Sequence, residues 1–557
     1  MSKELRRAAP VAARGPGDLA ALSPDAGTEP SSAPGAPVRA RSFGLAVLCT
    51  ILFLTFLDTT IVSVALADIQ QRLHAGVSPL QWVVNGYALV FASLMLLAGS
   101  LGDRFGRKAV MLGGLTVFCA GSLLAALAPN VDVLVAGRVV MGAGAAASEP
   151  GTLSMIRHMY PERRERTRAI SKWAAVSGLA LALGPVVGGA LVGLGTWRAI
   201  FWFNLAAGLL VIAGAASVLP ESADPVAGAS LDLRGFALGT LALAALVFAI
   251  IVGEQAGYGD PAIAALFGVA ALSGIGFLVA ERRSPAPMLE LSYFRRPAFS
   301  GALAVALAIY FGIFSVFFFT TLYLQSVVNY SPYRTAREFL AMAAAMIVAS
   351  LLAGRLVAAI GPRLPMAGGC VLAGAGLLWT DVVLQASVPA AGPLAAGLAL
   401  AGVGFGLTVV PVTSVALAVV RPAKSGMAAS ATNTSRELGS VLGVAVLGAL
   451  VNASLTSSLS QRLHALGIPN VFQAIVIHAI ETGQVPQSSS YAQTYGAIVN
   501  KVISAAFGAF REGLHLALVT SAALVLAAAV VSLGTLRHGR GADDDSDPDT
   551  AEPVRSA

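Results

Sequence analysis

The chain contains few charged side chains. Asp, Glu, Lys and Arg make up 12% of its 557 residues, whereas soluble domains contain about 25%. Hydrophobic residues make up 56% of the sequence, and apolar runs long enough to cross a bilayer recur along its whole length. This composition excludes an ordinary soluble globular protein and predicts an all-α, polytopic integral membrane protein.

Residues that carry covalent or metal chemistry are also scarce. The three cysteines, Cys49, Cys119 and Cys370, lie in apolar runs, where small buried side chains are expected and a disulfide framework is not. The six histidines are dispersed, and neither a phosphate-binding glycine loop, a metal-ligand spacing nor a nucleophile triad stands out. We therefore expect no enzyme activity, no ATP-driven pumping and no metal or cofactor. The net charge of +7 reflects basic loops, so nucleic-acid binding is not expected either.

Fourteen apolar runs are predicted to form transmembrane helices. Residues 1–42 are rich in Ala, Pro, Gly and Ser, a composition that predicts a disordered cytoplasmic tail. The segment 537–557 is acidic and is predicted to form a second disordered cytoplasmic tail. Residues 453–511 predict a long outer loop with a helical hairpin over the outer mouth. The predicted spans are residues 43–66, 80–100, 109–128, 131–156, 172–194, 199–219, 234–253, 261–280, 298–324, 337–357, 366–387, 391–420, 427–452 and 512–536.

Positive charges orient these spans. With the N-terminus inside, the inner segments contain 28 of the 36 Lys and Arg residues, the outer segments seven and the membrane interior one. Cytoplasmic loops of membrane proteins are enriched in Lys and Arg. The alternation therefore predicts an even number of spans, with both termini in the cytoplasm.

The sequence also contains an internal repeat. Two prolines and a glycine recur 261 residues later, where Pro150, Pro161 and Gly178 correspond to Pro411, Pro422 and Gly439. Duplicated halves of this kind are typical of secondary transporters. The repeat predicts two six-helix bundles, residues 43–219 and 298–536. Residues 220–297 would then hold two inserted helices that lie outside the translocation path.

A short, mostly basic segment joins the second and third predicted spans. Its glycines allow a sharp turn, and its cations place it in the cytoplasm. Asp103 is its one acidic residue and is expected to accept hydrogen bonds from the loop or to lie at a helix N-terminus. We expect this loop to act as a conformational switch, formed by Gly99, Gly102, Asp103, Arg104, Gly106, Arg107 and Lys108.

Asp58 is the strongest candidate for chemistry inside the membrane. It lies about two-thirds of the way along the first predicted span. A charge at such a depth costs at least ~2.5 kcal/mol, so an intramembrane carboxyl indicates a functional site. We predict that Asp58 binds and releases protons. The alternative is a structural hydrogen bond to a neighbouring threonine.

Arg138 is interpreted as the one cation inside the membrane, on the fourth predicted span. Glu149 follows eleven residues later, which is three helical turns plus about 20°, so the two side chains point the same way about 16 Å apart and cannot pair. They predict a polar line that faces the bundle interior. Glu149 is either a second protonation site or an acid at the cytoplasmic interface.

The fifth predicted span contains a glycine-proline motif. Its proline cannot donate an amide hydrogen bond, and its glycines form a face for close helix packing. We expect Pro185, Gly188 and Gly189 to give this helix a bend and a close-packed face that contacts the other half and seals the cavity; the alternative is ordinary helix packing with no bias in the direction of transport. The motif comprises Gly178, Gly184, Pro185, Gly188 and Gly189.

Two further features are candidates for a substrate path. Asp381 lies near the outer end of the eleventh predicted span and is either a path residue or an interfacial acid. Phe311, Phe314 and Phe318 form an aromatic stripe on the ninth predicted span. This stripe either lines a lipophilic pocket or contacts lipid.

These motifs resemble those of the major facilitator superfamily. The segment from Gly99 to Lys108 is similar to the signature loop after the second helix, and Arg138 matches the fourth-helix arginine. The motif around Pro185 resembles the antiporter motif of exporters in this superfamily. Asp58 lies in a string similar to the first-helix motif of fourteen-helix drug:proton antiporters, in which the matching acid is linked to proton coupling or to recognition of cationic drugs.

The resemblance implies a proton-coupled exporter of hydrophobic or amphipathic compounds that works by alternating access. A monomer in a bacterial cell membrane is expected, with a lipophilic small molecule, protons and membrane lipids as its partners. Glu149 and Glu437 depart from the family pattern, in which an apolar or amide residue is expected. The alternatives are an exporter dedicated to one endogenous secondary metabolite or lipid, and a membrane enzyme or receptor on the same scaffold.

Overall fold

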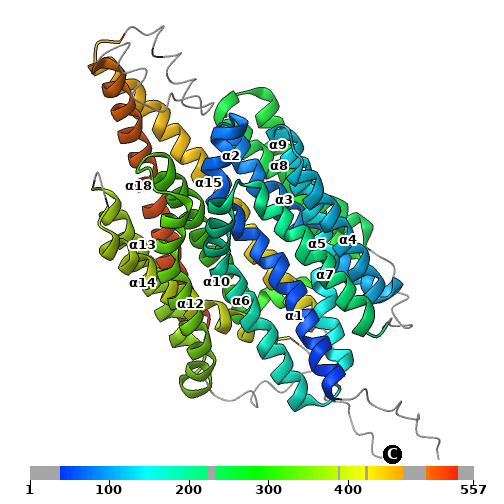
Figure 1. The fold of residues 1–557 in the computed structure, drawn as a ribbon. Coiled ribbons are helices and arrows are strands. Elements are labelled where there is room, and N and C mark those ends of the chain that lie inside the picture. The colour runs from blue at the N-terminus through cyan, green and yellow to red at the C-terminus, as the bar shows by residue number, and fades with distance from the viewer. Residues whose placement is uncertain are drawn as a thin grey trace, which may run out of the picture.

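The fold consists of helices that are long enough to cross a membrane. The computed structural model describes residues 38–222, 232–285, 287–386, 389–420, 425–468, 473 and 497–536 (Figure 1). In this part of the chain, fourteen helices are long and apolar enough to span a bilayer, and no strand is present. The predicted fold class and number of spans are therefore confirmed. The two predicted tails lie outside the described residues, except that residues 38–42 begin the first helix.

The N-terminal half contains six spans. The first is continuous through three consecutive elements, since a 3-10 turn and a short helix follow the first long helix without a break. The elements of this half are α1 (Val38–Ile61), η1 (Val62–Ala65), α2 (Leu66–Leu73), α3 (Val77–Phe105), α4 (Arg107–Ala126), α5 (Val131–Met159), α6 (Arg163–Leu194) and α7 (Arg198–Val218).

The second part of the chain contains eight spans. Two of them form an inserted hairpin, α8 (Leu233–Ala256) and α9 (Pro261–Arg283). The other six form the C-terminal half, and the first of these is interrupted by a π-helical turn, η3. The elements after α9 are η2 (Leu291–Arg295), α10 (Pro297–Ser315), η3 (Val316–Thr320), α11 (Thr321–Ser326), α12 (Pro332–Ile360), α13 (Arg363–Leu384), α14 (Ala391–Ala418), α15 (Ser425–Ala465) and α18 (Ala497–Thr535).

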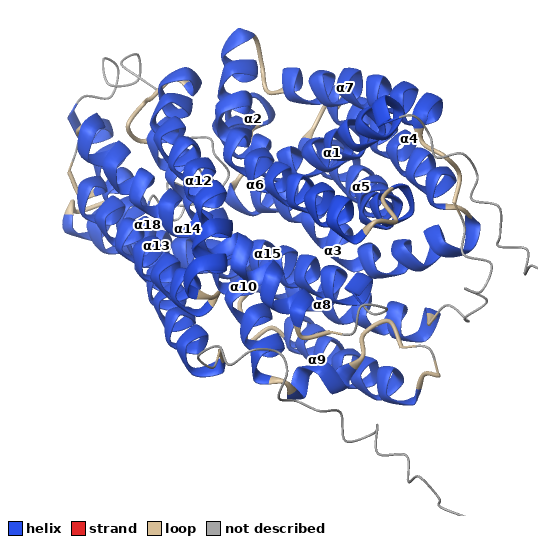
Figure 2. Ribbon diagram, turned by 90° about the horizontal axis from the view of Figure 1, so that it is seen from below, coloured by secondary structure: helices blue, strands red, loops and turns tan. Residues whose placement is uncertain are grey.

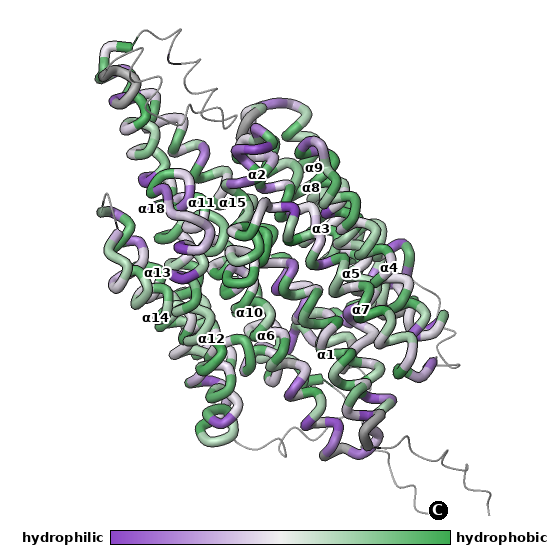
Figure 3. Tube along the Cα trace, viewed as in Figure 1, coloured by the Kyte–Doolittle hydropathy of each residue, from purple (hydrophilic) through white to green (hydrophobic). Residues whose placement is uncertain are grey.

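Short polar side chains cap the N-termini of several of these helices. Asn130 accepts a hydrogen bond from the third residue of α5, Val133, at 3.0 Å, and Asp260 accepts one from Ala262 in α9 at 2.7 Å. Such caps satisfy backbone N–H groups that have no partner inside the helix. Figure 3 shows that hydrophobic residues dominate the helices, whereas hydrophilic residues are more frequent near the two ends of the bundle.

Glycines bring the duplicated helix pairs into close contact. A Cβ built at Gly144 on α5 would lie 2.3 Å from the backbone nitrogen of Phe118 on α4. In the C-terminal half, a Cβ at Gly404 on α14 would lie 2.1 Å from the backbone nitrogen of Ala373 on α13. Small residues permit such backbone contact between membrane helices. The α4–α5 and α13–α14 pairs therefore pack in the same way, which supports the predicted duplication.

The two halves meet along two seams. At one seam α3 packs against α15, and at the other α6 packs against α12. The inserted α8 packs against both α3 and α15, and α9 packs against α8 (Figure 2). We call the end of the bundle that carries Gly106, Arg107 and Lys108 the basic end. The other end, which carries α2, is the opposite end.

The predicted long outer loop is wrong in its boundaries. Residues 453–465 continue α15 and residues 497–511 begin α18, so both segments are extensions of membrane helices. The extensions pack on one another through Leu455, Leu459 and Leu463 of α15 and Ala505 and Ala509 of α18. They project at the upper left of Figure 1 and do not lie over the mouth as a separate hairpin. The apolar stretch predicted at 471–480 lies outside the described residues, except for 473.

The glycine contacts generate a stability prediction with matched controls. Gly114→Val should lower the temperature of thermal unfolding in detergent, because its Cβ would lie 2.7 Å from the carbonyl oxygen of Gly144 and overpacking costs about 1–3 kcal/mol. Gly113→Val should unfold like the wild type, since a Cβ at the adjacent Gly113 meets nothing within 4 Å. Equal unfolding temperatures for the two variants would contradict this account of the packing.

Candidate functional site

A fully buried ion pair lies inside the N-terminal half. Asp58, in the last turn of α1, accepts a hydrogen bond at Oδ2 from Nη1 of Arg138 on α5. Its Oδ1 accepts a second hydrogen bond from Nδ2 of Asn204 on α7, at 2.5 Å. All three side chains are 0% exposed. Both carboxylate oxygens are thus hydrogen-bonded and the charge is matched, as burial of a carboxylate requires.

Helix α3 holds Arg138 in place. Nε of Arg138 donates to the carbonyl oxygen of Val83 at 2.9 Å, and the guanidinium carbon lies 4.4 Å from the ring centroid of Tyr87. The Tyr87 hydroxyl donates to the carbonyl oxygen of Thr55 on α1 at 2.9 Å. The cluster therefore ties α1, α3, α5 and α7 together within one half.

The sequence identified Asp58 and Arg138 as intramembrane charges but did not predict that they pair. The alternative of a threonine partner for Asp58 is not what the structure shows. Thr59 donates to the carbonyl oxygen of Phe56 at 2.6 Å, and Thr60 donates to that of Leu181 at 3.1 Å. The signal for the third member, Asn204, is a lone amide in an otherwise apolar span.

A second buried polar cluster joins the two halves. Glu149 on α5 is 2% exposed, and its Oε1 accepts a hydrogen bond from Nδ2 of Asn433 on α15 at 3.3 Å. Glu437, one turn farther along α15, is 1% exposed and accepts a hydrogen bond from Ser440 at 3.5 Å. Glu149 is therefore not an acid at the membrane interface. It lies at the boundary between the halves.

The interpretation of Arg138 as the one cation inside the membrane is wrong, because Arg436 is a second one. It lies inside the predicted span at residues 427–452, although the count of cations placed it in an inner segment, and within α15 it is 4% exposed. Its guanidinium donates to Thr413 Oγ1 at 2.5 Å, to the carbonyl oxygen of Val409 at 3.3 Å and to Asn433 Oδ1 at 3.3 Å. These hydrogen bonds go to neutral groups. Arg436 directly precedes Glu437 on α15, and it shares Asn433 as a hydrogen-bond partner with Glu149.

The fifth-helix motif, on α6, faces two different neighbours. A Cβ at Gly184 would lie 1.9 Å from Thr60 Oγ1, and a Cβ at Gly188 would lie 2.3 Å from the carbonyl oxygen of Ile61, so both glycines pack against α1 of their own half. A Cβ at Gly189 would lie 2.5 Å from Cβ of Ala336 on α12. The expectation that Pro185, Gly188 and Gly189 form a face against the other half is thus wrong for Gly188. Pro185 is buried within α6.

The predicted switch loop is mostly helical. Residues 99–105 form the last turns of α3, and the turn itself is Gly106, whose φ of +99° favours glycine. The acid at the start of α4 is Glu221, whose carboxylate accepts hydrogen bonds from the backbone N–H groups of Lys108 at 3.1 Å and Ala109 at 3.2 Å. The side chain of Asp103 lies outside the described part of the structure.

Asp381 lies between two helices of the C-terminal half. Its Oδ2 is 2.8 Å from Nδ1 of His515 on α18, and its Oδ1 accepts a hydrogen bond from Gln385 at 3.3 Å. Neither partner belongs to the N-terminal half. This geometry favours a structural role within the half over a place on the path between the halves.

The aromatic stripe is part of the protein core. Phe311 is 6% exposed, Phe314 is 3% exposed and Phe318 is 1% exposed, so the interpretation as a lipid-contacting stripe is wrong. Phe314 is 6.4 Å from the ring centroid of Tyr310 in a stacked arrangement. The backbone of Phe311 lies against Gly443 on α15. A role of the stripe in lining a pocket stays a prediction.

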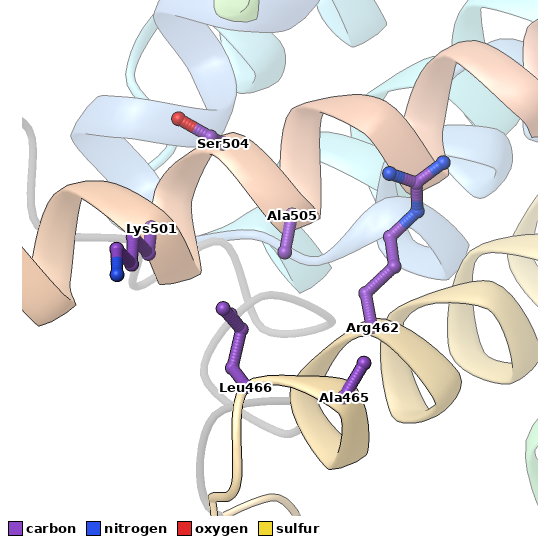
Figure 4. A pocket seen from close by; sticks show the side chains of 6 residues that line it. All are labelled: Arg462, Ala465, Leu466, Lys501, Ser504 and Ala505. Carbon is purple, nitrogen blue, oxygen red and sulfur yellow. The ribbon is translucent and has the colours of Figure 1, made fainter.

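A cavity of about 550 Å³ lies elsewhere, between the extensions of α15 and α18. Figure 4 shows Arg462 and Lys501 on either side of it, with Leu466 and Ala505 between them. Arg462 forms an ion pair with Glu512. This cavity is formed by the extensions of α15 and α18 and contains none of the buried acids.

The sequence profile of the Major Facilitator Superfamily matches residues 48–444. The chain belongs to this superfamily. Among its relatives, a multidrug resistance protein Stp of Mycobacterium tuberculosis is 35% identical over 429 residues, which are 77% of this chain and 79% of that protein. The tetracenomycin C resistance and export protein of Streptomyces glaucescens is 30% identical over 522 residues, which are 92% of this chain and 96% of that protein.

A solved structure shows the same fold. The crystal structure of a bacterial homologue of the human lysosomal transporter Spinster, described as inward-facing and unoccupied, matches with a TM-score of 0.63 and 17% identity over 90% of this chain and 99% of that one. Membership of the facilitator superfamily identifies the chain as a multi-pass membrane transporter rather than an enzyme.

The buried ion pair predicts a stability defect that a second substitution repairs. Asp58→Asn should lower the unfolding temperature in detergent, because removing one partner of a buried pair costs about 3–5 kcal/mol. Asp58→Asn combined with Arg138→Met should restore most of the loss, because no uncompensated charge remains. A double variant no more stable than Asp58→Asn would contradict the pairing.

The contact of Glu221 with the start of α4, beside the turn at Gly106, leads to a separate prediction. Glu221→Gln should impair transport more than substrate binding, because it weakens the anchor of α4 at the basic end and leaves the buried clusters untouched. Transport rate and equilibrium binding are compared on the same purified protein. Loss of binding in a folded Glu221→Gln variant would show that this anchor acts on the interior site.

Proposed function

We propose that the chain is a proton-driven exporter of hydrophobic or amphipathic compounds that works by alternating access. The single observation that carries the proposal is the fully buried Asp58–Arg138 pair, a titratable charge placed inside a membrane bundle. The export direction is supported by relatives that are named as multidrug resistance and antibiotic export proteins.

The basic end is proposed to face the cytoplasm. Lys and Arg gather in cytoplasmic loops, and both ends of the chain would lie on this side, because fourteen spans separate the start of α1 from the end of α18. At the opposite end the halves are in contact. Gln325 on α11 donates to the carbonyl oxygen of Val64 at 3.0 Å, and Ser326 donates to Gln70 at 3.4 Å.

The state of Asp58 supports a proton cycle with this orientation. Protonation of Asp58 would leave the guanidinium of Arg138 buried without a counter-charge, which is costly. We therefore propose that Asp58 is ionised while it pairs with Arg138 and the opposite end is closed. A carrier that takes up a proton outside and releases it inside must pass through such a state. In the conformation that is open at the opposite end, separation of Asp58 from Arg138 would allow Asp58 to bind a proton.

The Glu149 cluster is proposed as a second site of charge exchange. Glu149 and Glu437 are two buried acids that share one buried cation, Arg436. With both acids ionised the cluster would carry an excess negative charge, which is unfavourable in a low-dielectric interior. A proton or a cationic substrate neutralises it. Because Glu149 and Asn433 belong to different halves, either event acts directly on the contact between them.

An exporter dedicated to one endogenous metabolite or lipid is the second candidate. A panel of lipophilic dyes and antibiotics distinguishes the two: a multidrug exporter lowers cellular accumulation of several unrelated compounds, and a protonophore abolishes the difference. A dedicated exporter protects against one compound class alone.

Proteoliposomes test the proton coupling. A variant combining Asp58→Asn with Arg138→Met should lose uphill export of a compound identified in that panel under an imposed pH gradient, because the coupled carboxyl is absent while the buried charge remains balanced. Glu149→Gln serves as the comparison and should retain gradient-driven export with fewer protons exchanged per substrate.

The opposite pattern of transport results would assign the coupled proton to another carboxyl group. If the double variant still exports uphill and Glu149→Gln does not, the coupled proton resides on Glu149 and the assignment to Asp58 is wrong. Downhill exchange without a gradient reports that each protein is folded and inserted.

A further inference from the structure

Two acidic side chains lie at the base of the inserted hairpin. Asp232 directly precedes α8, and Glu281 lies in the last turn of α9. The ring of Phe248, in the second half of α8, is 5.6 Å from that of Trp82 in the first turns of α3, and α3 ends at the basic end. Because α8 and α3 run in opposite directions, Asp232 and Glu281 both lie toward the basic end.

The two carboxylates face the same small space. A Cβ built at Gly235, in the first turn of α8, would lie 3.0 Å from Oδ2 of Asp232 and 3.0 Å from Oε1 of Glu281. One turn farther along α8, a Cβ at Gly239 would lie 3.2 Å from the ring of Phe277 on α9. The absence of a side chain at Gly235 thus lets the two carboxylates approach each other where α8 and α9 pack closely.

Each carboxylate uses one oxygen in the fold. Oδ1 of Asp232 accepts a hydrogen bond from the backbone N–H of Gly235 at 2.8 Å and so caps α8. Oε2 of Glu281 accepts one from the backbone N–H of Leu289 at 3.1 Å. The other two oxygens, Oδ2 of Asp232 and Oε1 of Glu281, are the ones that face the space beside Gly235. Both are buried and have no hydrogen-bond partner among the described residues.

This arrangement leaves negative charge without a match. Glu281 is 3% exposed, and burial of a carboxylate is costly unless a positive charge or a hydrogen bond compensates it. The neighbouring basic residues in the sequence, Arg234 and Arg282, donate to neither of the two oxygens. The space between the oxygens therefore suits a cation.

The donor atoms indicate which cation fits. Zinc prefers histidine and cysteine ligands, and the site offers carboxylate oxygens. Calcium takes many oxygen ligands, whereas Mg²⁺ keeps several of its waters and is bound through one or two carboxylates. In the described part of the chain no group of three or more His, Cys, Asp or Glu side chains surrounds a common point. Glu281 also lines a cavity of about 570 Å³, which offers room for water.

We propose that Asp232 and Glu281 bind one hydrated Mg²⁺ ion, which joins the start of α8 to the end of α9. Glu281 also holds Leu289, in the segment that leads to η2 and the C-terminal half. The ion thus fixes the base of a hairpin that packs on both halves through α8. This inference is independent of the proposed export function.

Binding of Mn²⁺, which accepts the same oxygen ligands as Mg²⁺, tests the site by electron paramagnetic resonance. Chelator-treated wild-type protein in detergent should bind one Mn²⁺ ion more than the variant with Asp232→Asn and Glu281→Gln, and Mg²⁺ should displace that ion. Both substitutions keep an oxygen that can accept the hydrogen bonds from Gly235 and Leu289. Asp260→Asn is the matched control, because Asp260 caps α9 at the other end of the hairpin, and it should bind Mn²⁺ like the wild type.

Filling the space beside Gly235 tests the geometry. Gly235→Ala should weaken Mn²⁺ binding at least about tenfold, because its methyl group would lie 3.0 Å from both oxygens and residue 235 orients Asp232. A Cβ at Gly268 on α9 meets nothing within 4 Å, so Gly268→Ala should bind like the wild type. Mg²⁺ should raise the unfolding temperature of the wild type and of Gly268→Ala, but not that of the double variant, since a ligand of the folded state stabilises it.

Equal Mn²⁺ binding by the wild type and the double variant would overturn the proposal, as would undiminished binding by Gly235→Ala. In that case, an unfolding temperature that rises at lower pH in the wild type alone would show that Asp232 and Glu281 share a proton instead. Circular dichroism reports whether each variant is folded.

Discussion

The structure depends on how it keeps charge inside a membrane. An unmatched carboxylate or guanidinium in the bundle interior is costly, and the chain meets this constraint with a closed pair. Asp58 and Arg138 neutralise each other, and Asn204 supplies the remaining hydrogen bond to the carboxylate. Together with the contacts that Arg138 makes with α3, these interactions fix four helices as one unit. On the proposed proton cycle, a proton bound to Asp58 would change the charge balance of that whole unit, so that a local titration would alter the arrangement of a half.

The interface between the halves is built on a different principle. Small residues bring α6 and α12 into backbone contact near the opposite end, while Glu149 and Asn433 make a polar contact deep in the interior. Close packing of small residues favours one docked position. In the function that we propose, a bound cation or proton would neutralise or rearrange the polar contact. The inserted α8 adds an asymmetry, since it packs on both halves at one seam alone.

The sequence predicted the features that depend on composition and local pattern. Apolar run length determined the fourteen spans, and Asp58 and Arg138 were evident as isolated charges in apolar helices. Partnerships were not predictable, because the contact of Asp58 with Asn204 joins positions far apart in the chain. Arg436 lies inside the predicted span at residues 427–452 and was wrongly counted with the basic loop that precedes it. Gly188 and Gly189 are neighbours in sequence, yet they face different halves, since successive residues are 100° apart on a helix.

The most direct test of the central claim measures protons released when substrate binds. Purified wild-type protein in weakly buffered detergent solution should release protons on binding a transported compound, because substrate and proton favour different states of the carrier. The variant with Asp58→Asn and Arg138→Met should bind the compound with a clearly smaller release. Equal proton release by the two proteins would show that the Asp58–Arg138 pair does not carry the coupling.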